Sequence, residues 1–500
     1  MRVRFLLFLL PALLAAQSLK DFEKKVTKFT LANGLTFLVI ERHDAPIVSF
    51  HTYVDVGSVD DPTGRTGLAH MFEHMAFKGT PTIGTKDWAA EKKALDKVEE
   101  IYDMLEAEEN KGFRADKKKV DSIKADLNGA IEKAESFVVV NEFDQVVESN
   151  GGVGMNADTS EDHTEFFYSL PSNRIELWWL LESERFLNPV FREFYKERDV
   201  VREERRMRTE SSPVGKLVEV MLSTAFEAHP YKNAPIGWAS DIESFRRTEA
   251  EAFYKKYYVP SNITIAIAGD VNPADAKKMA EKYFGRIPKG PESPRVRTVE
   301  PVQVGEKRAG VASPAQPFLL IGYKRPDQYS ADDAALDVLN DILSDGRTGI
   351  IYKEMIRDSK IAVGAESIPG FPGGKYPSLF LFFVAPSQGH SIEENEKAID
   401  AIIERMKTQA VDAESLQRVK TKLRASLIRK LDSNSGLASE LATYEANYGD
   451  WRKLFTELDD YNKVTADDVM RVAKAYLTKD TRTVAYTYAP AKASAAGDAK

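Results

Sequence analysis

The pattern of apolar and polar positions predicts a sheet near the start of the chain. Apolar runs over residues 27–31 and 35–40 flank the dipeptide Asn33-Gly34. Asn-Gly between two apolar runs is a strong signal for a β-hairpin, because both residues tolerate the positive φ angles of a tight turn. A further strand is predicted over about 47–56. The chain therefore begins with strands, and a helix with two histidines follows them.

Residues 86–138 have a different pattern from their surroundings. They are rich in Lys, Glu, Asp and Ala and contain almost no Gly or Pro. The segments 88–109 and 117–137 are predicted to form two long, exposed helices joined by a turn at 110–112. A solvated helical hairpin without chemistry is the favoured interpretation. A lid or an arm that docks a partner is the alternative.

The ends of the two halves of the chain show the same pattern. In each, a helix that begins with Thr and ends with aromatic residues precedes a strand rich in β-branched residues. The first copy has Thr248 as its cap, a helix over 248–258 and a strand over 263–270. The second has Thr465 and segments 465–476 and 481–488. The sequence therefore predicts an internal duplication.

The starts of the two halves match more loosely. The strand predicted at 318–323 leads into a helix over 334–343, as the strand at 47–56 leads into the histidine-containing helix. The second helix carries no metal ligands. A Pro-rich stretch separates the halves. The predicted domains are 17–287 and 302–490, with a linker at 288–301.

Composition places the chain among soluble globular proteins of more than one domain. It has 500 residues, 43% hydrophobic and 29% charged, which is too long for one ordinary core. The net charge of −8 leaves no excess of cations for phosphates, so nucleic acid is not expected as a partner. The last ten residues, 491–500, are rich in Ala, Gly and Lys and are expected to be disordered.

The N-terminus predicts export. A basic start, an apolar run and small residues at Ala15-Ala16 describe a signal peptide over residues 1–16. The apolar run is short for a membrane span, although a retained anchor is the alternative. We expect cleavage near Ala16, no membrane span in the mature chain, and a periplasmic or otherwise exported location. Because the chain has no Cys, neither disulfides nor thiolate metal ligands are available.

The candidate chemistry lies in the sequence His70-Met71-Phe72-Glu73-His74. Residues four apart on a helix share a face, so both imidazoles can reach one metal ion. Glu73 lies beside His74, close enough to act on a water without being a ligand. Zinc, a water and a carboxylate base are the parts needed to hydrolyse a peptide bond. The alternative is an amphipathic helix with two incidental histidines.

A third protein ligand is expected to be a carboxylate from another helix. Glu197 and Glu204 are seven residues apart and therefore lie on nearly the same face of a helix. We predict Glu204 as the ligand and Glu197 as a carboxylate that orients the site. Glu203 is turned off that face and is the alternative ligand. The alternative for this segment is an ordinary charged helix that binds no metal.

Three motifs together resemble one family. His70-x-x-Glu73-His74 and the following residues 75–80 are similar to the zinc motif of the pitrilysin, insulysin and mitochondrial processing peptidase family, the inverzincins. The glycine-rich stretch 151–159 resembles that family's strand ending in Asn-Ala. The segment 197–204 resembles its downstream glutamate motif. The order of the motifs is also that of the family, closest to its short bacterial two-domain class.

The resemblance implies the fold. It predicts an α+β protein with two homologous α/β-roll domains, each an antiparallel-rich sheet flanked by helices, forming half of a clam-like peptidase. Only the first domain is expected to bind zinc, one ion per chain. The charged helical hairpin is an insertion in that domain, and it places Glu204 farther from His74 than is usual in the family.

The resemblance also implies how substrate binds. A peptide is expected to add as a strand beside the glycine-rich segment, where Gly154, Asn156 and Ala157 are the candidate contacts. A tight β-bulge is the alternative for this segment. The remaining histidines are expected to be surface or core residues; they are His43, His51, His163, His229 and His390.

One departure from the family pattern bears on partners. Family members commonly carry an Arg and a Tyr in the second half that stabilise the tetrahedral intermediate. Tyr352 is present here, but Ile350 stands where the Arg is expected, and Arg347 would substitute only with shifted geometry. We therefore expect a homologous partner chain, in a heterodimer or else a homodimer, to supply the Arg and Tyr.

The sequence thus predicts a zinc metalloendopeptidase that cleaves peptides or unfolded segments in an enclosed cleft. Glu73 is its predicted catalytic base, and His70, His74 and Glu204 are its predicted ligands. The alternatives are a non-catalytic binding or scaffold subunit related to processing peptidases, and a metal-binding export protein. Non-catalytic relatives typically lack an intact zinc motif, and the sequence shows none of the His clusters that a metal-binding export protein predicts.

Overall fold

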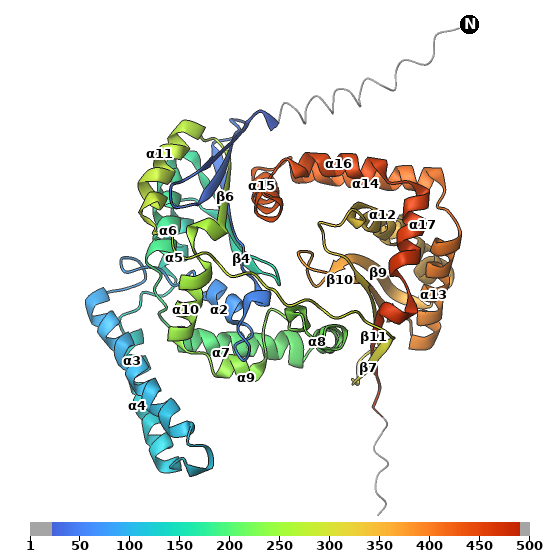
Figure 1. The fold of residues 1–500 in the computed structure, drawn as a ribbon. Coiled ribbons are helices and arrows are strands. Elements are labelled where there is room, and N and C mark those ends of the chain that lie inside the picture. Colours follow the sequence, from blue (N-terminus) through green and yellow to red (C-terminus); the bar gives the residue numbers. More distant parts are fainter. Residues whose placement is uncertain (1–22, 491–500) are drawn as a thin grey trace, which may run out of the picture. The chain divides into compact units, whose positions relative to one another are not determined.

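The computed structural model describes residues 23–490 (Figure 1). The predicted signal peptide and the predicted disordered tail lie outside the described residues. The chain forms two compact units. Unit 1 contains the described residues up to Arg202, Pro235–Arg295 and Lys430–Phe455. Unit 2 contains Glu203–Ala234, Val296–Arg429 and the described residues from Thr456 onward.

Unit 1 is built on a six-stranded sheet in the order β1-β2-β6-β3-β5-β4. The pair β2–β6 is parallel, and the other pairs are antiparallel. The predicted hairpin around Asn33-Gly34 is confirmed, because β1 pairs with β2 in antiparallel register. The strands are β1 (Val26–Thr30), β2 (Thr36–Glu41), β3 (Ile47–Val54), β4 (Val153–Thr159), β5 (Thr164–Pro171) and β6 (Ile263–Gly269).

Unit 2 is built on a five-stranded sheet in the order β7-β11-β8-β10-β9. The pair β7–β11 is parallel, and the other pairs are antiparallel. Once β1 is set aside, the two sheets have the same strand order and the same pattern of parallel and antiparallel pairs, which confirms the predicted duplication. The strands are β7 (Lys307–Ala312), β8 (Leu319–Arg325), β9 (Ala362–Phe371), β10 (Ser378–Pro386) and β11 (Arg482–Tyr488).

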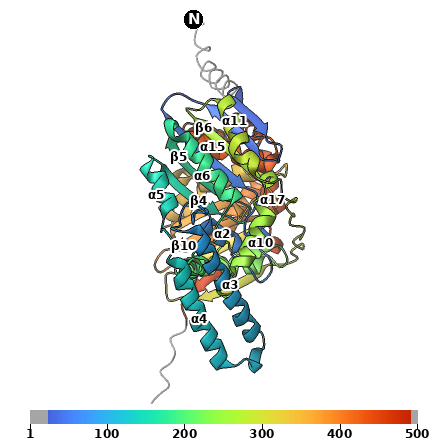
Figure 2. The same ribbon diagram turned by 90° about the vertical axis from the view of Figure 1, so that its left-hand side faces the viewer.

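Helices complete each unit, and the charged hairpin extends from the rest of unit 1 in both views (Figures 1 and 2). Each sheet buries one apolar face in its own core. The helices of unit 1 are α2 (Leu68–Met75), α3 (Trp88–Glu109), α4 (Lys117–Glu135), α5 (Glu142–Ser149), α6 (Ile175–Leu187), α9 (Ala239–Glu243), α10 (Arg247–Tyr257), α11 (Pro273–Tyr283) and α15 (Asn434–Tyr448). Those of unit 2 are α8 (Pro213–Ala225), α12 (Asp333–Ser344), α13 (Ile392–Thr408) and α17 (Ala466–Tyr476). Three helices cross a boundary between the units: α7 (Phe194–Arg205), α14 (Ala413–Lys430) and α16 (Lys453–Lys463).

The predicted domains, 17–287 and 302–490, are continuous halves of the chain. Each observed unit instead combines segments from both halves. Helix α15 comes from the C-terminal half but packs on β3 and β6 of unit 1. Helix α8 comes from the N-terminal half but packs on β7 and β11 of unit 2. Within the predicted linker, residues 288–301 form no helix or strand.

The charged hairpin is only partly exposed, which corrects the prediction of two exposed helices. Helices α3 and α4 have nearly the predicted bounds. However, Leu95, Val98 and Ile101 on α3 are buried in the core of unit 1. At the tip, Phe113 is fully exposed. One face of the hairpin is therefore part of the core, and its other face and its tip are solvated.

One predicted helix cap is confirmed and one is wrong. Thr465 caps α17, where its hydroxyl accepts from the N–H of Asp468 at 3.1 Å. Thr248 lies inside α10 instead, because Glu249 reaches back to the N–H of Arg246 at 3.1 Å and the helix begins earlier. Among the described residues, no helix is long and apolar enough to cross a membrane.

Candidate active site

The helix with the two histidines is held at its first turn by a buried carboxylate. Asp61 accepts hydrogen bonds from the N–H groups of Gly67 at 2.7 Å and Ala69 at 2.9 Å. Gly67 has a φ of +93°, and a Cβ there would lie 2.7 Å from the carbonyl oxygen of Ile236. Burial raises the pKa of Asp61, although these backbone hydrogen bonds oppose the rise. The start of α2 is therefore fixed by side-chain capping and by close backbone packing.

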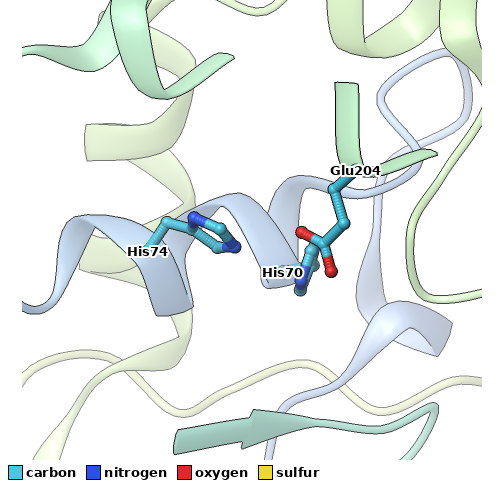
Figure 3. A group of neighbouring side chains, drawn as sticks. All are labelled: His70, His74 and Glu204. Carbon is cyan, nitrogen blue, oxygen red and sulfur yellow. The ribbon is translucent and has the colours of Figure 1, made fainter. Parts of the chain in front are cut away.

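The structure brings His70, His74 and Glu204 together (Figure 3). One ligand atom from each lies within 4.8 Å of the other two. His70 and His74 are one turn apart on α2, and Glu204 lies in the last turn of α7.

This donor set fits zinc. Two imidazoles and one carboxylate are the protein ligands of many catalytic zinc sites, in which a fourth position stays open. The chain offers no thiolate that would direct a different metal. His70, His74 and Glu204 are therefore the residues that would hold the ion.

Glu197 lies against the second histidine. Its Oε2 is 3.3 Å from Nδ1 of His74, and its Oε1 accepts from Nζ of Lys78. Burial alone would raise the pKa of Glu197, but the hydrogen bonds to His74 and Lys78 outweigh it and lower the pKa to about 2. A carboxylate ionised in this way orients the imidazole and increases its basicity toward a metal.

The alternative ligand points elsewhere. Glu203 is half exposed and pairs with Arg206 on the same helix, with 2.7 Å between its Oε2 and Nε of Arg206. The side chain of Glu204 is 15% exposed and also pairs with an arginine, Arg208, at 3.0 Å, but one of its carboxylate oxygens lies within 4.8 Å of a ring nitrogen of each histidine. The helical offset inferred from the sequence explains the difference, since consecutive residues on a helix face about 100° apart.

Glu73 lines a cavity of about 270 Å³ next to His74. The same cavity is lined by Glu142 and Asp144 from α5, which sequence reasoning did not single out. No local motif marks them, because they reach the cavity only through the fold. The spacing of residues along one helix identifies neighbours on that helix only. Glu142 and Asp144 lie on a different helix, α5, which follows the charged hairpin.

The glycine-rich segment forms β4, which is an edge strand within residues 23–490 and pairs there with β5. The register between Val153 and Asn156 is shifted, so the expected bulge and the expected edge strand are both present. Gly154 has a φ of +65°, and a Cβ there would meet nothing within 4 Å. Asn156 is exposed, and Ala157 is half-buried. The edge therefore offers unpaired backbone groups to an added strand.

The candidate residues of the second half lie in unit 2. Tyr352 begins a π-helical turn, η9 (Tyr352–Asp358), and is half-buried. Ile350 packs against the core of unit 2, and Arg347 is exposed in the preceding turn. An apolar residue at 350 is thus part of the packing of that unit.

The other histidines have local partners. His51 is 3.0 Å from Glu165, and His163 is 2.9 Å from the hydroxyl of Ser160. His163 and Glu165 form a second group of potential ligands with the exposed Asp158. Burial lowers the pKa of His163. These contacts are those of hydrogen-bonded residues, and the sequence-based expectation of a surface or core role for these histidines stays a prediction.

A buried ion pair, also missed from sequence, supports the loop after α2. Nε of Arg192 is 2.7 Å from Glu91, and both side chains are almost fully buried. The guanidinium also donates to the carbonyls of Thr80 at 2.9 Å and Ile83 at 2.8 Å. Arg192 thereby ties α3 to residues 78–84, of which Lys78 and Gly84 line the cavity beside Glu73.

Comparison with known proteins gives a consistent result. Residues 36–96 match the insulinase domain of peptidase family M16, and residues 244–423 match the peptidase M16 inactive domain. The zinc protease PqqE of Helicobacter pylori is 27% identical over 481 residues, 95% of each chain. A probable mitochondrial-processing peptidase subunit beta of Arabidopsis thaliana is 23% identical over 473 residues, 91% of this chain and 76% of that one.

The fold is also found in a solved structure. The crystal structure of a protease from Helicobacter pylori matches with a TM-score of 0.78 and 26% identity, covering 93% of this chain and 99% of that chain. The likeness therefore extends over most of this chain and nearly all of that one. The match named an inactive domain begins at residue 244 and includes none of the three candidate ligands.

Proposed function

Because this chain belongs to the insulinase peptidase family, M16, in its two-domain bacterial class, we propose that it is a zinc-dependent endopeptidase. The observation that carries the proposal is the grouping of His70, His74 and Glu204 on two helices. Glu73 lies beside them at a cavity and is not part of the donor set. That is the arrangement expected of a hydrolytic zinc site with a separate carboxylate base.

In the proposed reaction, Glu73 moves the protons. It takes one from the attacking water and delivers it to the amine that leaves when the peptide bond breaks. Zinc, when bound, supplies Lewis acidity that activates water and polarises the scissile carbonyl. Glu197 keeps the ring of His74 in one orientation. The apolar neighbours of α2 limit water around these groups.

The substrate is proposed to add to β4 as an extra strand. Within the part of the chain that the structure describes, the outer edge of β4 offers backbone donors and acceptors, and the bulge near Gly154 leaves open space beside the main chain. Asn156 is exposed at this edge. Recognition through main-chain hydrogen bonds requires an extended segment, so peptides and unfolded segments are the proposed substrates.

The substitution Glu73→Gln tests the reaction directly. The variant should bind zinc as the wild type does and lose peptidase activity by at least about 10³-fold, because it removes the proton carrier while keeping the shape. Zinc content and cleavage of quenched fluorescent peptides are the measurements. Glu203→Gln, an exposed change on α7, is the control and should retain activity. An active Glu73→Gln enzyme would contradict the proposed mechanism. A wild type that binds zinc without cleaving peptides would favour a binding or scaffold subunit.

We further propose that a homologous chain completes the enzyme. The family's Arg is absent at Ile350, whose partly buried side chain packs against the core of unit 2. A partner would supply that Arg and a Tyr to stabilise the oxyanion. The purified chain alone should therefore cleave peptides much more slowly than the chain with its partner. Full activity of the isolated chain would contradict the two-chain proposal and leave the zinc chemistry standing.

Export is proposed from the N-terminal sequence. Its basic start and apolar run are those of a signal peptide. Mass spectrometry of the protein recovered from its native host should find a mature N-terminus near Gln17. Recovery of the full-length chain in the cytoplasm would contradict this proposal.

A further inference from the structure

The far end of the charged hairpin is a solvated turn that projects from the rest of unit 1 in both views (Figures 1 and 2). Residues 110–119, here called the hairpin tip, join α3 to α4 through the short turn η2 (Gly112–Arg114). Every residue of the tip except Ala115 is exposed. Helix α4 has 19 residues, which places the tip about 28 Å from the base of the hairpin. The tip is therefore available for contacts that the fold of unit 1 does not use.

The charge of the hairpin tip is opposite to that of its surroundings. The tip contains five cations and one carboxylate, whereas the chain as a whole has a net charge of −8. Helix α3, which leads to the tip, contains eight carboxylates and three lysines. A solvated helix of mixed charge would spread its charges along its length. In this hairpin the positive charge is concentrated at one end.

The carboxylates at the end of α3 already have partners. Glu108 pairs with Lys111 at 2.7 Å and with Lys119 at 2.8 Å. Glu109 pairs with Lys124 at 2.8 Å. These two carboxylates therefore compensate two of the five cations of the tip and leave three others.

The three remaining cations form no ion pair within residues 23–490; they are Arg114, Lys117 and Lys118. Asp116 lies between them in sequence but caps α4, where it accepts from the N–H of Lys118 at 2.9 Å. Like charges on neighbouring residues repel one another, and only water and salt screen them here. A negatively charged surface would pair with all three and remove the repulsion.

Phe113 adds an apolar group at the outermost turn. Its side chain is fully exposed, and the guanidinium carbon of Arg114 lies 5.9 Å from the centre of its ring. A single exposed apolar residue is ordinary on a protein surface. Phe113, however, lies between Lys111 and Arg114. An aromatic ring flanked by cations has the chemistry of an interfacial membrane anchor, because the ring enters the headgroup region while the cations meet phosphates.

The size of the hairpin tip favours a bilayer over a protein as the surface that it meets. A stable protein interface takes about 800 Å² and roughly 20–30 residues from each partner. The tip offers only residues 110–119, and the helix that leads to it is acidic. Binding to a bilayer needs no matching shape, because each cation near an anionic surface and each apolar group that leaves water contributes separately.

We propose that the hairpin tip docks this protein on a bilayer that contains anionic lipid. Phe113 enters the headgroup region, and Arg114, Lys117 and Lys118 meet the lipid phosphates. The carboxylates of α3 are repelled by the same surface, so the hairpin approaches with its tip first. The inference does not rest on the proposed peptidase function, because no residue of the tip belongs to the candidate active site.

Co-sedimentation of the purified full chain with lipid vesicles tests the inference. One set of vesicles contains phosphatidylcholine alone, and the other contains equal amounts of phosphatidylcholine and phosphatidylglycerol. The chain should bind the anionic vesicles about a hundredfold more tightly, since each of the three unpaired cations contributes about a factor of five. Raised salt should weaken this binding. Inorganic phosphate at the concentration of the lipid phosphate should not displace the chain, because one phosphate cannot meet three cations and a ring.

Variants of the hairpin tip separate its two contributions. Changing Arg114→Gln, Lys117→Gln and Lys118→Gln together should lower the affinity for anionic vesicles about a hundredfold. Phe113→Ala alone should lower it about tenfold. The matched control for charge changes the net charge equally and should keep the affinity; it replaces the three exposed lysines of α3 with Gln, namely Lys92, Lys93 and Lys97.

A fluorescent label measures insertion of the tip separately from binding. Because the chain has no Cys, Phe113→Cys and, as the control, Lys93→Cys each provide a single attachment point for an environment-sensitive nitrobenzoxadiazole label. The label at 113 should brighten and shift to shorter wavelength on anionic vesicles. The label at 93, near the start of α3, should not respond.

Equal binding of the wild type to neutral and anionic vesicles would overturn the inference, as would an absence of binding to both. Full affinity of the triple tip variant, or the same label response at 113 and 93, would also overturn it. Displacement by inorganic phosphate would do so by showing a site for single phosphates in place of a surface. None of these results concerns the zinc chemistry, which is decided by its own test.

Discussion

At the scale of single residues, the candidate site depends on carboxylates that no motif marks. Asp61 accepts two backbone hydrogen bonds at the start of α2. The hydroxyl of Thr66 donates to Asp241 at 2.7 Å and accepts from the N–H of Trp238 at 2.9 Å. Trp238 and the start of α9 are thereby attached to the chain just before the histidine helix. The spacing of His70 and His74 places them on the same face of α2. The contacts of Asp61 and Thr66 fix the position of the start of that helix.

Glu197→Gln should weaken zinc binding by about 10–100-fold, because it removes the negative charge that orients His74. A second effect is expected from Lys78, which loses one of its two carboxylate partners and keeps Glu193. The measurement is zinc affinity by competition with a chromophoric chelator, and activity at saturating zinc should recover most of its value. Glu203→Gln makes the same change on the same helix without contacting a histidine and should leave the affinity as it is. An unchanged affinity in Glu197→Gln would show that this contact does not tune the site.

At the scale of elements, the turn between β4 and β5 contains Glu161, a carboxyl group whose surroundings disfavour its ionised form. Burial, with Asp162 and Asp158 nearby, raises the pKa of Glu161 from 4.5 to about 8. Between these two values the folded chain keeps a proton that the unfolded chain has lost. The free energy of unfolding therefore falls as the pH rises from about 4.5 to about 8.

Glu161→Gln should remove this part of the pH dependence. The variant should match the wild type near pH 4.5 and exceed it by about 2–4 kcal/mol near pH 8. Denaturant unfolding at the two pH values measures the difference. Glu148→Gln, an exposed change, should show no such divergence. A variant that is less stable than the wild type at pH 8 would mean that the ionised carboxylate is stabilised in the fold.

Local elements were predictable from the sequence, and their long-range packing was not. The bounds of α3, α4 and α12 follow from short-range periodicity and turn residues, so they agree closely with the prediction. The burial of Leu95 and Val98 depends on contacts with segments that are distant in the sequence. The many charged residues of α3 suggest an exposed helix instead. The cap at Thr248 failed because a competing capping carboxylate, Glu249, acts on an earlier residue.

The same division applies to the candidate site. His70, Glu73 and His74 share one helix, so their relation is visible in the spacing alone. Glu204 was identified only with the help of helical geometry and family resemblance. Asp144 and Asp61 reach the site through tertiary structure, and nothing within a few residues of either marks it.

At the scale of the whole molecule, each unit borrows a helix from the other half of the chain. Tyr53 on β3 donates to Asn447 of α15 at 3.1 Å, and Lys28 on β1 pairs with Glu445. Unit 1 therefore requires residues beyond 430, although its sheet is complete by residue 269. The duplicated topology is thus not a pair of independent halves joined by a linker. Stability of unit 1 depends on chain segments from both ends of the sequence.

Zinc should add to this stability because its candidate ligands join two helices. His70 and His74 lie on α2, and Glu204 lies on α7. A ligand that binds only the folded chain stabilises it by about 4 kcal/mol at a thousand times its dissociation constant. Chelation should therefore lower the unfolding temperature by roughly ten degrees, measured by calorimetry. His70→Ala should already unfold at the lower temperature and should not respond to chelation. Glu73→Gln should respond as the wild type does, because Glu73 is proposed to move protons and not to hold the metal. Loss of the chelation response in Glu73→Gln would make Glu73 a ligand and would overturn the division of roles proposed for the motif.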